Sequence, residues 1–139
     1  ADNVVPAEAR VRVDVRITDL AEGERLESAF AELRSVDPAA TLEIGGGINR
    51  PPLERAATAD LFAMATRVAA AAGIPAPIGV DVGGGSDGNF TGALGVPTLD
   101  GLGVTGGGAH ADHEHAELAT MCDRVTLVAG LLAELTATD

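Results

Sequence analysis

Apolar and polar residues alternate along residues 10–18, which predicts a strand with one buried face. The apolar positions are Val11, Val13, Val15 and Ile17. Asp19 and Glu22 follow with the spacing of a capping box, and apolar residues then recur at helical spacing, so we expect a helix that ends near Val36. The stretch ATLEI, residues 40–44, predicts a second short strand. The first 45 residues are therefore expected to form a β-α-β unit.

The stretch GGGINRPP, residues 45–52, is the strongest linker signal in the chain. After it the pattern predicts a helix over about residues 53–72 with Gly73 as its stop, and a short apolar strand, PIGVDV. A glycine turn, a short helix ending at Gly95 and a strand, VPTLDGL, come next. An amphipathic helix over about residues 118–136 completes the chain. This order of helices and strands predicts an α/β fold.

Composition narrows the classes of function. The hydrophobic fraction is 46%, which supports a packed core rather than disorder. The net charge of −12 and the scarcity of aromatic residues argue against binding to nucleic acid or to an anionic membrane. The single cysteine, Cys122, excludes a disulfide within the chain. Because no basic leader precedes an apolar segment and no run is apolar enough to span a bilayer, we expect a cytoplasmic protein.

Candidate chemistry is concentrated in two glycine-rich loops. The stretch GGGAHADHEH, residues 106–115, holds His110, His113 and His115, whose spacing is no established chelating signature. A metal site and a solvated polar loop both remain open for it. The stretch DVGGGSDGNF resembles a phosphate-binding turn but lacks the P-loop lysine, and a tight turn capped by Ser86 or Asp87 explains it equally well. A serine hydrolase elbow is not supported, because the pattern is not GxSxG.

Two longer stretches carry a family resemblance. NVVPAEARVRVDVRI, together with GGGSDGNFTGALGVPTLDGLGVTGGGAHADHEHAEL, resembles the co-catalytic zinc exopeptidases of the glutamate carboxypeptidase, acetylornithine deacetylase and succinyl-diaminopimelate desuccinylase type. The glutamate carboxypeptidase branch looks most similar. The resemblance implies that residues 1–48 are the second half of a ferredoxin-like (β-α-β) lid or dimerisation domain. Residues 49–139 would be the C-terminal segment of the α/β catalytic domain.

The resemblance also implies roles for individual residues. His110 would be a ligand of one of two zinc ions, whereas His113 and His115 match no ligand of the family. Substrate-binding positions would be Asn3, Arg16, Arg50 and Gly85. Arg16 would hold the terminal carboxylate of the substrate, a task that suits the planar guanidinium group. The remaining zinc ligands and the general-base glutamate match nothing here, and the resemblance places them in an N-terminal segment outside these residues.

These observations predict the C-terminal portion of a zinc-dependent metallopeptidase that cleaves the amide bond of a small peptide or an N-acyl amino acid. We expect the 139 residues alone to be inactive, because a single imidazole cannot hold zinc with useful affinity. We also expect a homodimer formed through the lid, with the absent N-terminal segment as a further partner. Two alternatives stay open: a non-catalytic module that binds a carboxylate or a protein partner, and a metal chaperone that uses the histidine loop.

Overall fold

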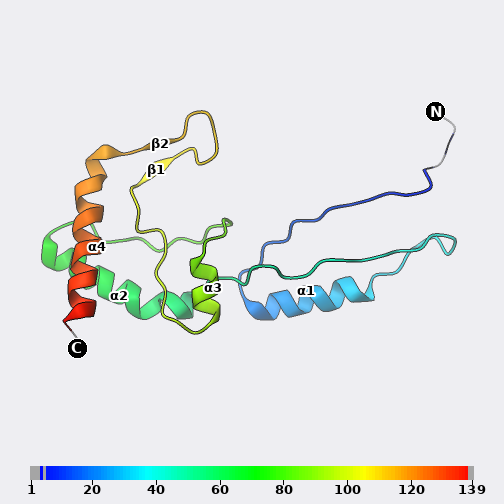
Figure 1. Ribbon diagram of the computed structural model, residues 1–139, viewed down its shortest axis with the longest axis horizontal. Helices are drawn as coiled ribbons and strands as arrows, with labels where there is room; N and C mark the ends of the chain where they lie inside the picture. The colour runs from blue at the N-terminus through cyan, green and yellow to red at the C-terminus, as the bar shows by residue number, and fades with distance from the viewer. Residues whose placement is uncertain (1–3, 5, 138–139) are drawn as a thin grey trace.

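A computed structural model describes residue 4 and residues 6–137 of the chain. Along the chain its elements are α1 (Leu20–Glu32), α2 (Arg55–Ala72), α3 (Gly88–Ala93), β1 (Gly106–Gly107), β2 (His115–Ala116), the 3-10 helix η1 (Leu118–Thr120) and α4 (Met121–Thr136). Figure 1 shows an elongated molecule in which α1 lies at one end and α2, α3 and α4 gather at the other. Residues 33–54 connect the two ends.

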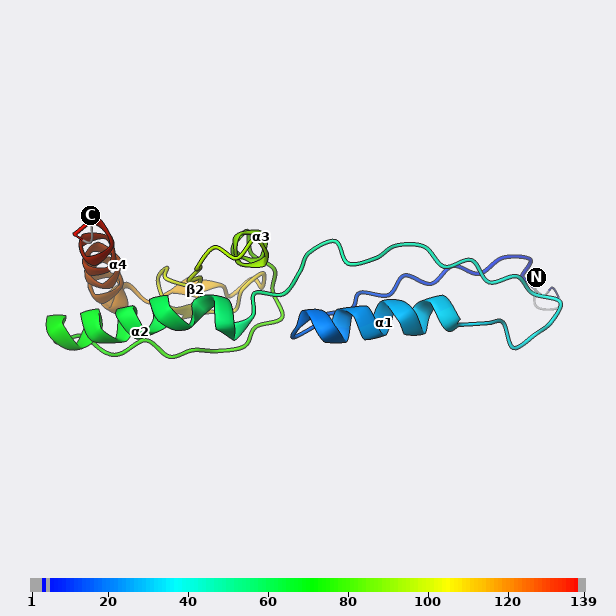
Figure 2. The same cartoon turned by 90° about the horizontal axis from the view of Figure 1, so that it is seen from below.

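The core lies where α4 crosses α2 (Figures 1 and 2). Its buried side chains are Ala65, Val68, Ala69, Leu127 and Leu131. Leu99 and Leu102, from the segment that precedes β1, pack against this cluster. Gly130 of α4 faces Val68 so closely that a Cβ atom at this position would overlap the valine side chain. The two helices can therefore approach only because position 130 has no side chain.

The helices follow the predicted pattern closely. Gly73 ends α2 in the left-handed conformation, with φ of 67°, and its N–H bonds the carbonyl oxygens of Ala69 and Ala70. A residue without Cβ adopts this conformation at no steric cost, so the predicted stop at Gly73 is confirmed. The helix at α1 ends at Glu32, earlier than the expected Val36.

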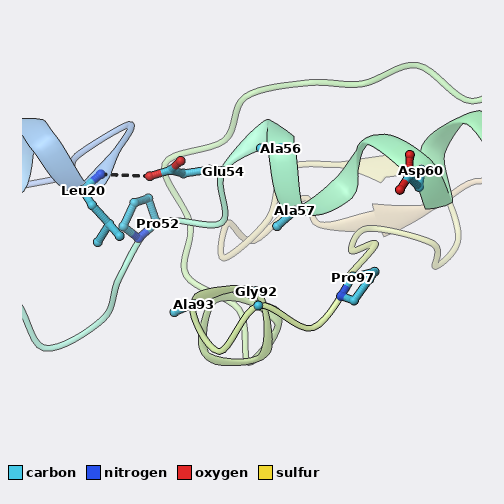
Figure 3. A pocket seen from close by; sticks show the side chains of 10 residues that line it. Leu20, Pro52, Glu54, Ala56, Ala57, Asp60, Gly92, Ala93 and Pro97 are labelled. Atoms are coloured by element: carbon cyan, nitrogen blue, oxygen red, sulfur yellow. Dashed lines mark hydrogen bonds between the residues drawn. The ribbon is translucent and has the colours of Figure 1, made fainter.

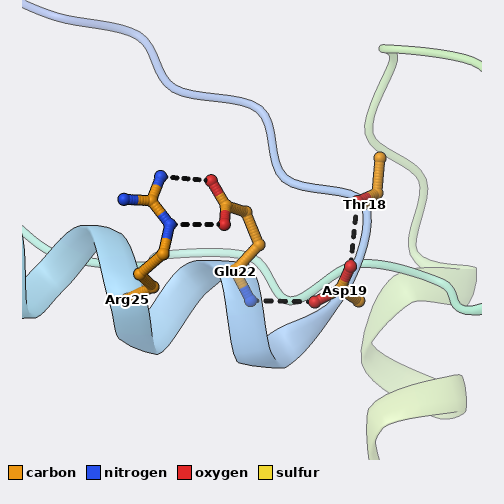
Figure 4. Close-up of polar contacts among 4 residues, drawn as sticks. All are labelled: Thr18, Asp19, Glu22 and Arg25. Carbon is orange, nitrogen blue, oxygen red and sulfur yellow. Dashed lines mark hydrogen bonds and ion pairs between the residues drawn. The ribbon is translucent and has the colours of Figure 1, made fainter.

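The N-terminus of α1 is capped by Asp19 (Figure 4). The Asp19 carboxylate accepts a hydrogen bond from the backbone N–H of Glu22 at 2.8 Å, which satisfies one of the open donors of the first turn. This bond lowers the pKa of Asp19 below its usual value. Glu22 completes no capping box, because its side chain bonds Arg25 through both oxygens, at 2.7 and 2.6 Å. The bonds from Arg25 lower the pKa of Glu22 as well.

The segments on either side of α1 meet at Gly23. A Cβ atom on this buried glycine would lie 2.6 Å from Cδ1 of Ile48 and 2.9 Å from Cδ1 of Ile17. The backbone N–H of Ile48 also donates to Glu27 at 3.1 Å. Figures 1 and 2 show the chain running toward α1 through residues 6–18 and returning past it through residues 33–50. Gly23 thus lets both segments approach the helix.

The predicted strands are not formed as sheet in the described residues. The four segments are residues 10–18, 40–44, 77–82 and 96–102, and none carries a ladder of backbone hydrogen bonds. The sheet in this part of the chain is the antiparallel pair β1–β2, with Gly106 opposite Ala116. Alternation predicts an extended chain with two different faces, but a strand also needs a neighbouring strand. Helices with a small sheet remain compatible with an α/β class, whereas the expected β-α-β sheet is not observed.

The unpaired segments leave apolar side chains in solvent. Val11 and Ile78 are each 85% exposed. Further exposed apolar side chains on the same segments are Val13, Val80 and Val82. These positions are the ones that the alternating pattern predicts to be buried, so the faces intended for burial have no cover within the described residues.

The close contact at Gly130 generates a prediction about stability. Gly130→Ala is expected to lower the free energy of unfolding by about 1–3 kcal/mol, because the branched Val68 side chain has few rotamers with which to avoid the new methyl group. Urea denaturation followed by circular dichroism measures this change.

A double-mutant cycle provides the control. In a Val68→Ala background the steric conflict is removed, and Gly130→Ala should become neutral or stabilising because alanine favours a helix by up to about 1 kcal/mol over glycine. An equal loss in both backgrounds would contradict the proposed contact.

Candidate functional site

The glycine turn, residues 83–86, leads into α3. It is held by the side chains of Ser86, at the end of the turn, and of Asn89, in α3. The backbone N–H of Ser86 donates to Oδ1 of Asn89 at 2.8 Å, and the Ser86 hydroxyl oxygen accepts from the N–H of Gly88 at 3.1 Å. Asp87 makes no such capping bond. Of the two caps that the sequence suggested, Ser86 is the one that the structure uses. The turn is therefore fixed locally by short polar side chains.

Two arginines that are distant from this turn in the sequence, Arg16 and Arg50, contact it. Arg16 donates from Nη1 to the carbonyl oxygen of Gly83 and contacts Asp14 at 3.3 Å. The guanidinium carbon of Arg50 lies 5.0 Å from the centre of the Phe90 ring. A Cβ atom on Gly85 would lie 2.9 Å from both Cδ and Nη1 of Arg50. Tertiary structure thus brings Arg16, Arg50 and Gly85, all named from the sequence, to one place.

Arg16 and Arg50 give a positive charge to the side of the turn that they contact. Asp81, two residues before the turn, is paired with Arg55 at 2.7 Å. The Arg16 side chain remains 63% exposed despite its two contacts. Arg50 makes no hydrogen bond or ion pair with any residue that the structure describes. An anion that approaches the turn would therefore meet two accessible guanidinium groups.

His110 lies in the loop between β1 and β2, a loop that Figure 1 shows at the end of the β1–β2 pair. Its φ of 66° is the positive value of a non-glycine residue, a strained conformation that clusters at functional sites. Its backbone N–H donates to Glu114 at 3.3 Å, and no hydrogen bond joins it to Arg16 or Arg50 within residues 6–137.

The histidine loop does not assemble a metal site from its own side chains. His110 and Asp112 do stand in His-x-Asp spacing. Among the described residues, however, no group of three histidine, cysteine or acidic side chains is placed to hold a metal ion. The ring of His113 instead lies beside Gly108, and the His115 ring nitrogen Nδ1 is 3.1 Å from the carbonyl oxygen of His113. The described residues alone therefore do not form a metal site around His110.

Asn3, the other predicted substrate-binding residue, lies outside the described residues. Two residues at the turn were missed by the sequence reasoning, Asn89 and Phe90. Both belong to the quoted stretch GGGSDGNF, and Phe90 is one of three aromatic residues in the chain. Because the contacts of Asn89 with Pro51 and of Phe90 with Arg50 span about 40 positions, no local pattern could have revealed them.

A shallow pocket lies near the start of α2 (Figure 3). It is distinct from the arginine cluster, by which we mean Arg16 and Arg50 at the glycine turn. Its walls are small apolar residues together with Glu54 and Asp60. Glu54 already accepts a hydrogen bond from the backbone N–H of Leu20 at 3.0 Å, which joins α1 to the start of α2. None of the residues predicted from the sequence to bind substrate or metal lines this pocket, which we interpret as a seam between the two parts of the molecule.

Residues 4–134 match the family model of peptidase family M20/M25/M40. The chain belongs to this peptidase family. Comparisons with curated proteins and with solved structures gave no significant match. Membership in the M20/M25/M40 family supports a hydrolase of the metallopeptidase class, and peptidases of this family generally use zinc. No helix among the described residues has the length and apolar character needed to cross a membrane.

Proposed function

We propose that this chain contributes substrate-binding residues to a zinc-dependent exopeptidase of the glutamate carboxypeptidase type. Its substrate would be a small peptide or an N-acyl amino acid, cleaved at the amide bond next to the terminal amino acid. The observation that carries the proposal is the convergence of Arg16 and Arg50 on the turn at Gly85. We place the lid segment at residues 1–48 and the catalytic-domain segment at residues 49–139.

In this proposal Arg16 binds the terminal carboxylate of the substrate. Its guanidinium group can present two parallel N–H donors to a carboxylate. Its present partners, the Gly83 carbonyl oxygen and Asp14, each accept only one hydrogen bond from it. The bond to Asp14 is long, at 3.3 Å, and lies in solvent, so it contributes little to holding the side chain. A substrate carboxylate therefore exchanges a weak contact for a bidentate one. Arg50 adds a second positive charge beside the same turn.

The zinc chemistry of the family cannot be completed by the described residues alone. Zinc bound by the full ligand set would polarise the scissile carbonyl group and acidify a bound water molecule. Within residues 6–137 we assign His110 as a ligand, and no group of three histidine, cysteine or acidic side chains lies together there to complete a metal site. The remaining ligands, and the glutamate that we expect as general base, would come from an N-terminal segment.

The role of Arg16 can be tested in an active enzyme that contains this segment. Arg16→Ala is expected to lower kcat/KM by an amount that corresponds to about 2–4 kcal/mol, the loss for a charged hydrogen-bond partner of the substrate. Arg12→Ala is the matched control, because Arg12 lies on the same polar face of residues 10–18, is exposed and has no hydrogen-bond partner among the described residues. A change below about threefold for Arg16→Ala would show that Arg16 is merely solvated.

The incomplete ligand set predicts how the 139 residues behave by themselves. We expect no hydrolysis of an N-acyl glutamate or of a dipeptide, and less than one equivalent of bound zinc, because a closed site needs several ligands at once. Metal analysis after dialysis and a hydrolysis assay with added zinc measure both quantities. Robust zinc-dependent hydrolysis would refute the assignment of the general base to another segment. Carboxylate binding without hydrolysis in a complete natural protein would instead favour the non-catalytic alternative.

The uncovered apolar segments lead us to propose a homodimer that forms through the lid. Pairing of residues 10–18 between two chains would satisfy backbone hydrogen-bond groups and cover Val11 and Val13. Burial gains about 25 cal/mol per Å², which over a strand-sized contact exceeds the screened repulsion between two acidic chains. Sedimentation equilibrium at micromolar concentration in 0.15 M salt should give a dimer or a larger assembly.

A pair of variants identifies the contact. Val13→Lys should shift the dimer toward monomer, because it places a charge on the apolar face, whereas Arg12→Lys on the opposite face should leave the assembly unchanged. A cooperative, well-folded monomer of the unaltered chain would contradict the proposed pairing.

A further inference from the structure

The start of α3 contacts the segment around Arg50 through two neighbouring side chains. Asn89 bonds the residue that follows Arg50, and Phe90 lies against the guanidinium group of Arg50 itself. We propose that Asn89 and Phe90 are positioning residues that hold Arg50 over the glycine turn, ready to meet an anion. The anion is the substrate carboxylate only if the function proposed above is correct, but the positioning itself does not depend on it.

Phe90 offers the face of its ring to the guanidinium group. The separation of 5.0 Å between Cζ of Arg50 and the ring centre is within the range of a cation–π contact. Such a contact uses the flat face of the guanidinium group and leaves its N–H groups at the edge free. Because Arg50 has no other hydrogen bond or ion pair within the described residues, those donors stay available to a ligand.

Asn89 fixes the backbone from which Arg50 projects. Its side-chain nitrogen donates to the carbonyl oxygen of Pro51 at 2.8 Å, while its side-chain oxygen accepts from Ser86 at 2.8 Å. One partly buried amide therefore joins the glycine turn to the residue after Arg50. Pro51 and Pro52 restrict the backbone further, since proline fixes its own φ and limits the conformation of the preceding residue. Arg50 is thus held at its backbone as well as at its tip.

Gly85 supplies the space that Arg50 occupies. A Cβ atom there would lie 2.9 Å from two Arg50 atoms, closer than such contacts allow, so any larger residue must displace the arginine. At the neighbouring Gly84 a Cβ atom would meet nothing within 4 Å, and its φ is not positive. Arg16 differs from Arg50 because it already bonds Gly83 and Asp14. Arg50 is accordingly the cation of the pair whose hydrogen-bond donors have no partner among the described residues.

The side-chain Nε–H group of Arg50 gives a direct readout of this positioning in the 139-residue chain. Its ¹⁵N relaxation and chemical shift should report an ordered group in the unaltered chain. Phe90→Leu, which keeps apolar volume but loses the ring, should increase its mobility to that of exposed arginines such as Arg12. Phe90→Tyr should restore the order. Asn89→Asp, which keeps the acceptor for Ser86 but loses the donor to Pro51, should also mobilise Arg50.

A matched glycine pair tests the same geometry from the other side. Gly85→Ala should displace Arg50 and change its Nε–H signal, whereas Gly84→Ala should leave the signal unchanged. Far-UV circular dichroism and the backbone amide shifts of α2 and α4 show that each variant keeps its fold. If Arg50 stays as ordered in Phe90→Leu and in Gly85→Ala as in the unaltered chain, the positioning role is wrong.

Titration with N-acetyl-L-glutamate separates this proposal from the proposed function. Phe90→Leu should raise the Kd about two- to fivefold, while Phe90→Tyr should leave it unchanged. An unchanged Kd in Phe90→Leu with a mobile Arg50 would show that the ordering has no bearing on ligand binding and would overturn the proposal. If the unaltered chain binds no N-acetyl-L-glutamate and the relaxation differences hold, the positioning of Arg50 stands and the carboxylate substrate fails.

Discussion

The close crossing of α2 and α4 at Gly130 and Val68 forms the buried core of the described structure. This crossing buries Leu127, and Ala65 and Ala69 provide a surface that is flat enough for α4 to approach. The N-terminal half of α2 also contacts the segment that follows α3, because the backbone N–H of Thr98 bonds the carbonyl oxygen of Ala57. Leu53, just before α2, fills the space beside Gly92 of α3.

The arginine cluster is held by several weak contacts rather than by one strong one. The ion pair between Arg55 and Asp81 is exposed, and a surface pair of this kind contributes little stability. The Asn89 amide and the Phe90 ring are each modest in energy as well. These two contacts matter for geometry, because they act on the neighbouring residues Pro51 and Arg50. A site of this type can hold an arginine in place while leaving its donors exposed to a ligand.

Membership in the M20/M25/M40 family concerns the class of reaction, whereas the geometry of the turn concerns the residues that could bind a substrate. The family supplies the class of reaction, a metallopeptidase, over residues 4–134. The turn brings two arginines together, and we propose that they bind the carboxylate at the end of a peptide or an N-acyl amino acid. The backbone of His110 has a positive φ of 66°, and the described residues place no group of three possible metal ligands around it.

The sequence by itself determined the features that depend on near neighbours. Helix periodicity located α2 and α4, the Asp19 cap began α1, and Gly73 ended α2, because each of these rests on bonds within a few residues. The resemblance to a family named Arg16, Arg50 and Gly85, but not the contacts that unite them. Only the tertiary structure decided that Asn89 and Phe90 hold the Arg50 segment, since those contacts span about 40 positions. It also decided that none of the alternating segments pairs within the described residues, because alternation defines the two faces of a strand but does not determine its hydrogen-bonding partner.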